Sequence, residues 1–466
     1  MRKKTTNKFI VLLIGALLSG FLLIASMLRQ PFLVDRSIVL SDAEMLFIML
    51  SGSILFFGLT ILFLILYKER RQLDLNLEQP TSSSQTPSAP SPSFSDDLDE
   101  AEDTEASSSR FFMLTQVDAR ARHDQRPPVL PPITLATLCQ EFRHFAASTL
   151  GLYYDIHDIR RFIGGLSVSH IMILQGMSGT GKTSLAYAFG DYLQNPATVV
   201  PIQPMWKERT DLIGYYNEFT KKFNETTLLQ KLYEASHNDR MYITVLDEMN
   251  IARVEYYFAE FLSLLELPDQ NKRKLDVIAD VWDNDPSLLK DGKLILPDNM
   301  WFLGTANNDD STFSISDKVY DRAMVINLDK KAEPFIPQPV SGRHLTAPTF
   351  ARLIAEAKER YALSERNMRR LKAFDQYLIK HFQITFGNRI MQQIKDYVPV
   401  IIACGGSELS ALDDMMSKKV LRKLETKNMV YVKNSAPGLI AFIEELFGED
   451  TMESCKTYIR HIELNV

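Results

Sequence analysis

Gly176-Met-Ser-Gly-Thr-Gly-Lys-Thr183 is the stretch that decides the fold of this 466-residue chain. It follows the apolar run His170 to Gln175 and precedes the helix-like sequence Ser184 to Phe189. Its glycines let the backbone curl so that N–H groups point at phosphate oxygens, and the start of the next helix adds a favourable dipole. A glycine-rich turn is the alternative, but a strand before and a helix after are the setting that a phosphate-binding P-loop requires.

The loop predicts a site for a nucleoside triphosphate and its magnesium ion. Lys182 would reach the β- and γ-phosphates, and the hydroxyl of Thr183 would hold Mg²⁺. The predicted nucleotide-binding residues are Gly176, Ser178, Gly179, Thr180, Gly181, Lys182, Thr183 and Ser184.

Two carboxylates follow the next strand-like apolar run, Tyr242 to Leu246. Asp247 at the strand end can hold Mg²⁺ through water opposite Thr183, and Glu248 can polarise an attacking water. An ordinary helix start would also explain an Asp-Glu pair. However, Asp247 follows Lys182 by 65 residues, as a P-loop hydrolase requires.

A polar amide and an arginine accompany two further strand-like runs, Trp301 to Thr305 and Met324 to Leu328. Asn307 could orient the lytic water, although an Asn after a strand is usually a turn residue. Arg322 ends the stretch Asp317-Lys-Val-Tyr-Asp-Arg322. It is either a surface ion-pair residue or an arginine finger for the γ-phosphate of a neighbouring subunit.

Strand and helix signals alternate through this part of the chain, which predicts an α/β fold with a parallel sheet. The apolar stripe from Arg253 to Glu266 predicts one helix that packs into the core. Beyond Pro339 the sequence is mostly helical and predicts a smaller α-helical domain.

The N-terminus carries two uncharged apolar runs, Phe9 to Leu28 and Met45 to Tyr67, each long enough to cross a bilayer. A cleaved signal peptide is the alternative for the first run, but that run is longer than a signal h-region and a second follows closely. Basic residues flank the two outer ends, so the positive-inside rule places both ends in the cytoplasm. We therefore expect a two-helix hairpin in the lipid bilayer of the inner (cytoplasmic) membrane.

The resulting domain organisation has five parts. They are a transmembrane hairpin (1–72), a disordered tether rich in Ser, Pro and acidic residues (73–110), a connector (111–132), an α/β nucleotide-binding domain (133–335) and a helical lid (340–466). The net charge of −6 gives no electrostatic footprint for nucleic acid. Cys139, Cys404 and Cys455 are too far apart for a metal or redox motif.

Four motifs, in this order, resemble those of AAA+ ATPases, and more narrowly the McrB-type branch, the motor subunits of McrBC modified-DNA restriction systems. They are the P-loop, Leu246-Asp-Glu-Met-Asn250, Gly304-Thr-Ala-Asn307 and the stretch that ends at Arg322. The resemblance covers roughly residues 130–460. It implies an AAA+ P-loop core with a parallel sheet and a C-terminal α-helical lid.

The resemblance also implies roles for single residues. Lys182 and Thr183 match Walker A, and Asp247 and Glu248 match Walker B. Phe386-Gly-Asn-Arg389 resembles a sensor 2 arginine, with an ion pair inside the fold as the alternative. The implied catalytic residues are Glu248, Asn307 as sensor 1, Arg322 as the trans-acting arginine, and Arg389.

One further stretch resembles the loop that this family turns towards a central pore. It is Asp211-Leu-Ile-Gly-Tyr-Tyr-Asn217, between Walker A and Walker B. Trp206 or the Tyr215–Tyr216 pair could therefore touch a substrate, although buried aromatic residues are the commoner case.

The chain also departs from the restriction members of the family. A membrane hairpin stands where those members carry a DNA-reading domain, and no nuclease motif is present. GTP-using members show Met-Asn-x-x-Asp at sensor 1, whereas this chain has Ala306-Asn-Asn-Asp-Asp310. ATP is therefore the expected nucleotide, and GTP stays open.

The sequence thus predicts a membrane-anchored AAA+ ATPase that forms a homo-oligomeric, hexameric ring. It would hydrolyse ATP at the subunit interfaces and remodel an unidentified protein partner. One alternative is a McrB-like, DNA-translocating motor of anti-phage defence that works with a separate nuclease subunit. Another is a nucleotide-switched scaffold.

Overall fold

The computed structural model describes residues 109–122, 131–177, 179–307, 312–328 and 332–464. All of them belong to one compact unit, Glu100–Val466. The predicted membrane hairpin, nearly all of the predicted tether and Ser178 lie outside the described residues. Within the described ranges, no helix combines the length and the apolar character needed to cross a bilayer.

Five parallel strands form the central sheet in the order β2–β5–β8–β1–β9. They are β1 (Ile171–Gln175), β2 (Thr198–Pro201), β5 (Tyr242–Asp247), β8 (Met300–Ala306) and β9 (Met324–Asn327). All neighbouring strands pair in parallel, so the carboxyl ends of β1, β5 and β8 meet at one edge. The predicted parallel sheet is confirmed, although the short, half-exposed β2 carries no apolar run that could have predicted it.

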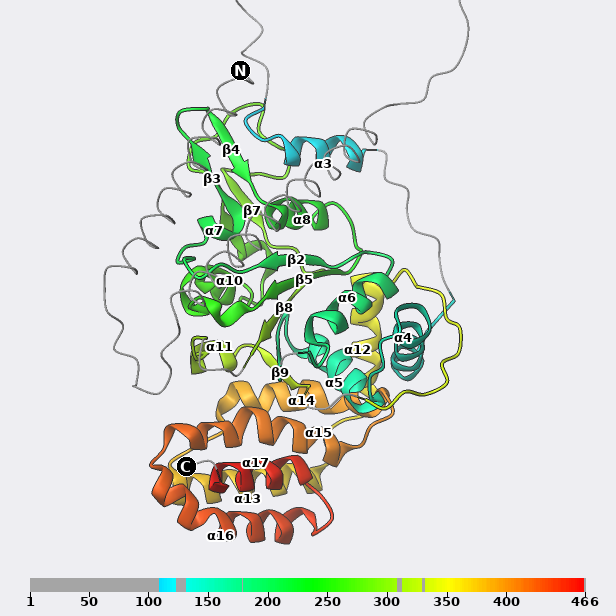
Figure 1. Cartoon of the computed structure of the whole chain (residues 1–466), viewed down its shortest axis with the longest axis vertical. Coiled ribbons are helices and arrows are strands. Elements are labelled where there is room, and N and C mark those ends of the chain that lie inside the picture. Colours follow the sequence, from blue (N-terminus) through cyan, green and yellow to red (C-terminus); the bar gives the residue numbers. More distant parts are fainter. Residues whose placement is uncertain (1–108, 123–130, 178, 308–311, 329–331, 465–466) are drawn as a thin grey trace, which may run out of the picture. The chain divides into compact units, whose positions relative to one another are not determined.

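Helices cover both faces of this sheet (Figure 1). Side chains alternate along each strand, so that Met172 and Leu174 of β1 enter one core while Ile171 and Ile173 enter the other. The first core is covered by α4 (Leu135–Leu150), α5 (Ile156–Val168) and α6 (Lys182–Tyr192). The second is covered by α7 (Thr210–Ile213), α8 (Thr227–Ala235), α9 (Val254–Tyr257), α10 (Ala259–Leu264) and α11 (Asp317–Tyr320).

The stretch from Arg253 to Glu266 is interrupted, whereas its apolar stripe predicts a single helix. Helices α9 and α10 meet at Phe258, whose φ of −107° and ψ of 6° are not helical. The rings of Phe258 and Phe261 stack 5.0 Å apart, and both contact the ring of Phe302 in β8 edge-on. This aromatic packing overrides the regular helical period.

Two β-hairpins that the sequence did not predict belong to the same domain. One is β3 (Gly214–Asn217) with β4 (Lys222–Glu225), and the other is β6 (Lys274–Asp276) with β7 (Lys293–Ile295). In Figure 1 both hairpins lie on the far side of β2 from the helical domain.

The predicted connector contains a docked helix, α3 (Met113–Ala121). The carboxylate of Glu225 in β4 accepts hydrogen bonds of 2.7–2.8 Å from the backbone N–H groups of residues 112–114, which start this helix. Just before it, the buried guanidinium of Arg110 pairs with Asp285 at 2.6 Å. Helix α3 thus joins the two hairpins, because Asp285 lies between β6 and β7.

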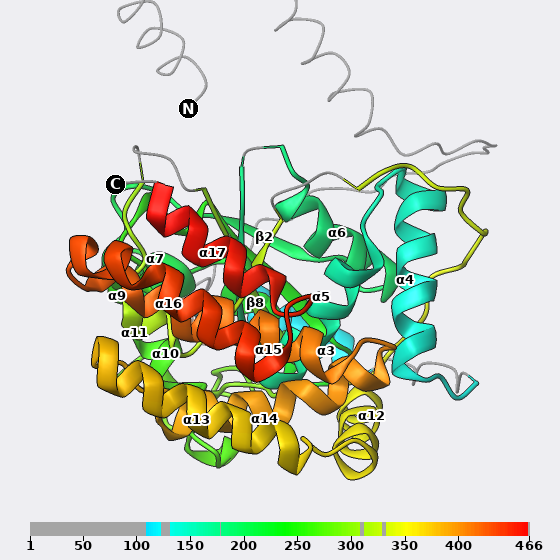
Figure 2. The same cartoon turned by 90° about the horizontal axis from the view of Figure 1, so that it is seen from below.

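The C-terminal region is helical, as the sequence predicts. It comprises α12 (Ala347–Arg360), α13 (Glu365–Phe382), α14 (Gly387–Ala403), α15 (Glu408–Met415), α16 (Met429–Phe447) and α17 (Glu453–Leu464). A π-helical turn (Met416–Val420) and a 3₁₀ helix (Leu421–Thr426) follow α15. Figures 1 and 2 show α14 and α15 between the sheet and the outer helices α13, α16 and α17.

Glu225→Ala should release α3 from the hairpins. It removes the acceptor of three charge-assisted hydrogen bonds at a helix start, which costs about 1.5–3 kcal/mol of local stability. Hydrogen exchange of the α3 amides should then accelerate, as mass spectrometry of the intact protein can measure. Glu218→Ala, at an exposed ion pair with Lys221, is the control. Equal exchange in both variants would contradict this account of α3.

Candidate active site

The P-loop turns between β1 and α6 through backbone angles that favour glycine. Gly176 and Gly181 have φ angles of 144° and 92°. A Cβ at Gly176 would also lie 2.4 Å from the carbonyl oxygen of Leu328. Gly181 begins α6 without a side-chain cap, so the first N–H groups of that helix are suited to bind an anion.

Lys182 folds back onto the P-loop. Its ammonium group donates to the carbonyl oxygens of Gly176 at 2.9 Å and Met177 at 2.8 Å, and the residue is buried. The Tyr154 hydroxyl donates to the carbonyl oxygen of Gly181 at 3.1 Å. Burial raises the pKa of Tyr154, so its hydroxyl stays protonated as a donor. The lysine and this tyrosine hold the loop in shape.

A single carboxylate oxygen joins three chain segments at the carboxyl edge of the sheet. Asp247 Oδ1 accepts hydrogen bonds from Thr183 Oγ1 at 2.9 Å and from Thr305 Oγ1 at 2.8 Å. The Thr305 hydroxyl in turn accepts the backbone N–H of Glu248 at 2.8 Å. The structure therefore brings the predicted Thr183, Asp247 and Glu248 together. Thr305 was not among the residues predicted from the sequence, although it belongs to the Gly-Thr-Ala-Asn motif.

Glu248 occupies a left-handed backbone conformation, with φ 52° and ψ 48°. This conformation is uncommon for a residue other than glycine and costs of the order of 1–3 kcal/mol. The next residue, Met249, is buried against Gly304, where a Cβ would lie 1.9 Å from the methionine sulfur. Met249 thus anchors the turn, and the side chain of Glu248 is left exposed at its tip.

Asn307 follows β8 at the same edge of the sheet. Its backbone oxygen accepts from the Asn250 side chain at 3.0 Å. Its side-chain Oδ1 is buried and has no hydrogen-bond partner among the described residues. An acceptor of this kind, next to the strand that ends in Asp247 and Glu248, is suited to accept a hydrogen bond from a water molecule.

The oxygen ligands at this edge fit Mg²⁺. Thr183 and Asp247 offer a hydroxyl and a carboxylate, the hard donors that Mg²⁺ selects. The described part of the chain has no cluster of three or more His, Cys, Asp or Glu residues able to hold a metal ion. One or two protein ligands suffice for Mg²⁺, which keeps several waters and bridges substrate phosphates.

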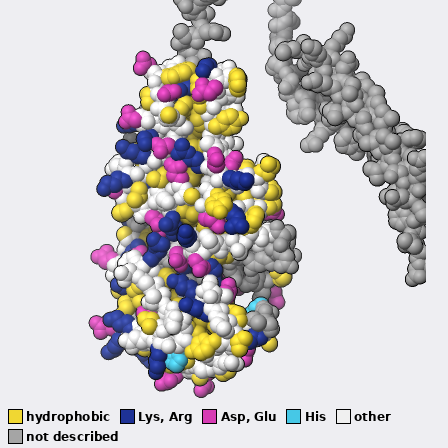
Figure 3. Space-filling view, turned by 90° about the vertical axis from the view of Figure 1, so that its left-hand side faces the viewer, with side chains coloured by type: hydrophobic (Ala, Val, Ile, Leu, Met, Phe, Trp, Pro, Cys, Tyr) yellow, Lys and Arg dark blue, Asp and Glu magenta, His cyan; other side chains and the backbone are white. Residues whose placement is uncertain are grey.

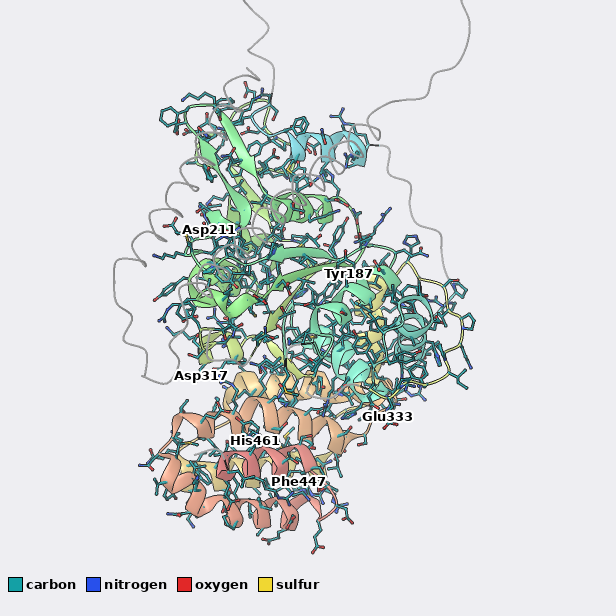
Figure 4. The ribbon with its side chains drawn as sticks, in the orientation of Figure 1. Tyr187, Asp211, Asp317, Glu333, Phe447 and His461 are labelled. Carbon is teal, nitrogen blue, oxygen red and sulfur yellow. The ribbon has the colours of Figure 1, made fainter. Side chains whose placement is uncertain are left out.

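Arg322 lies at the opposite edge of the sheet. It precedes β9, and its carbonyl oxygen accepts from Ser169 Oγ, just before β1, at 2.8 Å. The five residues of β1 span about 16 Å, and Lys182 lies beyond their far end. In Figure 4, Asp317 at the start of α11 lies beside the helical domain, well apart from Tyr187 of α6. Arg322 is therefore remote from the P-loop of its own subunit.

Arg389 lies beside Arg322. The two oxygens of Glu266, just after α10, bind one arginine each: Oε2 lies 3.2 Å from Arg322 Nε and Oε1 lies 2.9 Å from Arg389 Nη2. Arg389 thus makes the internal ion pair that the sequence left open as an alternative. This pair places Arg389 at the Arg322 edge. Nothing in the sequence around Glu266 indicates that its carboxylate lies between Arg322 and Arg389.

The predicted substrate-facing loop forms α7 and β3. Trp206 and Tyr216 are half-buried, and their rings pack edge-on against Tyr257 and Trp282, respectively. Tyr215 is 54% exposed, and Phe219 at the tip of the β3–β4 hairpin is 99% exposed. Tyr215 is thus available for contact with a substrate. The structure adds a second exposed ring, that of Phe219, which is not predicted from the sequence.

Comparison with known proteins agrees with this architecture. Residues 171–323 match the AAA domain of the dynein-related subfamily (AAA_5), and residues 344–463 match a domain of unknown function (DUF8727). The first match covers the P-loop, Asp247, Glu248 and Arg322. The middle of the chain is therefore an AAA+ P-loop domain, a class whose members in general hydrolyse nucleoside triphosphates, and it is followed by a helical region.

One solved structure is also similar to the chain, the crystal structure of a full-length MCM homologue from Methanopyrus kandleri. The match has a TM-score of 0.36 and 11% sequence identity, and it covers 63% of this chain. It spans 64% of that protein's chain. No curated protein matches the sequence.

Thr305→Val should slow turnover by about 10- to 100-fold while nucleotide binding is kept. Valine preserves the shape but removes the hydroxyl that joins Asp247 to the Glu248 N–H, a loss of about 1–3 kcal/mol. Steady-state hydrolysis and nucleotide titration measure the two effects separately.

Thr244→Val in β5 is the matched control, because the buried Thr244 hydroxyl has no hydrogen-bond partner among the described residues. We expect wild-type turnover from this control. Equal turnover in the two variants would contradict a role for the Thr305 bridge.

Proposed function

We propose that this protein is a membrane-anchored motor that hydrolyses ATP at the subunit interfaces of a ring and remodels a protein partner. The observation that carries the proposal is the division of the predicted catalytic residues between two edges of one sheet. Lys182, Thr183, Asp247 and Glu248 gather at the carboxyl edge. Arg322 lies at the amino edge and can serve only another copy of the chain.

In this proposal the carboxyl edge binds and orients the nucleotide. Lys182 and the first amides of α6 hold the phosphates, while Thr183 and Asp247 hold Mg²⁺, which when bound neutralises charge on the phosphate oxygens. The exposed carboxylate of Glu248 accepts a hydrogen bond from the attacking water and polarises it. Asn307 Oδ1 accepts a second hydrogen bond, which orients that water.

The amino edge completes the site of the neighbouring subunit. Arg322 would stabilise charge that develops on the transferred phosphoryl group. Arg389 shares Glu266 with it, so we extend the proposal to a pair of arginines donated together. Such a head-to-tail contact uses different faces of each copy and closes into a ring, for which six subunits are the expectation.

The charge distribution on one face of the molecule favours a protein partner over nucleic acid. Figure 3 shows the face with α10 and α11, where Lys and Arg side chains are interspersed with Asp and Glu and form no continuous basic patch. Nucleic-acid motors need such a patch to follow phosphates. The exposed rings of Tyr215 and Phe219 offer apolar contact instead. The two apolar runs before residue 72 support membrane anchoring.

Arg322→Ala should leave nucleotide binding intact and lower turnover by about 10³-fold or more. Glu248→Gln should also stop turnover. Rings mixed from the two variants should recover activity, because some interfaces join an intact Glu248 to an intact Arg322. Arg352→Ala, at an exposed ion pair with Glu356 in α12, is the control and should behave as wild type. Co-assembled mixed rings that recover nothing would contradict the shared site.

The Glu248→Gln variant should also identify the partner. Full-length protein extracted from its native membrane with ATP should hold its client without hydrolysis, and mass spectrometry then identifies that client. A membrane or cytoplasmic protein without nucleic acid would support the remodeller. A nuclease subunit or DNA in the same sample would replace it with the DNA-translocating motor.

A further inference from the structure

The backbone around Arg322 is held by side chains from other parts of the chain. The carbonyl oxygens of Tyr320 and Ala323 both accept hydrogen bonds from the Lys419 ammonium, at 2.6 Å for Tyr320. The intervening carbonyl oxygen of Asp321 accepts from Gln393 Nε2 at 3.2 Å. Together with the Ser169 contact to Arg322, every carbonyl of residues 320–323 has a side-chain donor.

Lys419 is an unusual residue for a purely structural contact. It is 4% exposed and makes no ion pair within 4.0 Å among the described residues. Burying an ammonium group without a carboxylate is costly. Lys419 also lies in the π-helical turn Met416–Val420, and such turns occur frequently at functional sites.

Arg422 also holds this segment in place. The guanidinium of Arg422 lies 3.4 Å from the centre of the Tyr320 ring and pairs with Asp317 at 2.6 Å. Gln393, Lys419 and Arg422 all fall within residues 344–463, the domain of unknown function. This domain therefore holds α11 and the turn before β9 at three points.

The side-chain end of Arg322 is held as well. Arg322 and Arg389 are both cationic and would repel each other, but the carboxylate of Glu266 forms an ion pair with each of them. The shortest contact of Arg322 with Glu266 runs through Nε at 3.2 Å, and a guanidinium carries two further nitrogens that can donate to a ligand. Its side chain is 27% exposed and that of Arg389 is 50% exposed.

We propose that the C-terminal helical domain positions the arginine pair for the neighbouring subunit, with Lys419 fixing the backbone of Arg322 and Glu266 aligning its guanidinium with that of Arg389. This inference rests on the proposed shared site. Lys419 and Glu266 are positioning residues, since neither touches the neighbour's nucleotide. A movement of the helical domain would then shift Arg322 and change hydrolysis in the next subunit, not in its own.

Lys419→Met in the full-length chain should lower kcat by about 10- to 100-fold, because a shift of about 1 Å in a catalytic group can cost that much. Nucleotide affinity should stay within about threefold of wild type. The matched control is Lys456→Met, which removes a lysine of the same domain that is 2% exposed and pairs with Glu444 and Glu453. Wild-type kcat in Lys419→Met, or an equal loss in both variants, would overturn the proposal.

Mixed rings show on which side of the interface Lys419 acts. Lys419→Met mixed with Glu248→Gln should recover activity, whereas Lys419→Met mixed with Arg322→Ala should not, because both defects then lie on the same edge. Recovery with Arg322→Ala but not with Glu248→Gln would mean that Lys419 acts on the site of its own subunit. That result would overturn the proposal. Failure of the Arg322→Ala and Glu248→Gln mixture would instead reject the shared site itself.

The stability of Lys419→Met can be checked against pH. Burial lowers the pKa of Lys419 to about 7; Asp321 opposes this shift, and Arg422, Arg389 and Lys423 add to it. The unfolded value is about 10.4, so the wild type loses stability as pH falls from about 10 to about 7. Lys419→Met has no amine at this position and does not lose this stability. Its melting temperature, relative to that of the wild type, should therefore rise as the pH is lowered from about 9 to about 7.

Glu266→Gln tests the same proposal at a more exposed position. Its outcome does not depend on whether Lys419→Met folds. It should lower kcat by about tenfold and follow the mixed-ring pattern of Arg322→Ala. Glu266→Asp, which keeps the charge, should recover part of the loss. Glu260→Gln, in α10 and paired with Arg209 at 3.0 Å, is the control. Recovery of Glu266→Gln by Arg322→Ala would overturn the proposal.

Discussion

The common direction of the five strands is the constraint on which the rest of this structure depends. A parallel strand has its two ends at opposite edges of the sheet, so β1, β5 and β8 bring the P-loop, Asp247 and Thr305 together. The same direction places Arg322, just before β9, at the other edge. In the proposed mechanism, one copy of the chain thus holds both halves of a site and cannot join them, and head-to-tail association of copies would resolve this separation.

The two edges differ in how their polar groups are satisfied. At the carboxyl edge the donors and acceptors come from the strand ends themselves, as with Thr183 and Thr305 around Asp247. At the amino edge, residues 320–323 run from the last residue of a four-residue helix to the start of a short strand, and their carbonyl oxygens need partners. A buried lysine of another domain supplies two of these partners. The packing of that domain and the placement of Arg322 therefore cannot vary independently.

Local patterns in the sequence predict the carboxyl edge well. The continuous apolar runs of β1, β5, β8 and β9 and the glycines of the P-loop are signals carried by adjacent residues. The break at Phe258, strand β2 and the two hairpins are set by tertiary contacts and have no comparable signal. The buried position of Lys419 is harder still to predict from the sequence, because the carbonyl oxygens that it binds are 99 and 96 residues away. A lysine in a stretch as rich in charge as Ser417-Lys-Lys-Val-Leu-Arg-Lys423 is expected to be exposed unless those acceptors are known.

Helix α14 connects the arginine edge to helix α5, and under the proposed mechanism it would give the helical domain a mechanical role. Its 17 residues span about 25 Å, with Arg389 in the first turn at the arginine edge and Ile401 in the last. Ile401 packs on Gly164 of α5, where a Cβ would lie 2.6 Å from its Cδ1. Such close contact resists sliding of α14 along α5. Because α5 leads directly into β1 and the P-loop, a shift of the P-loop on nucleotide binding would be carried along α14 to the arginines that, in the proposed ring, act on the neighbouring subunit. Successive sites around a ring would then be coupled in one direction.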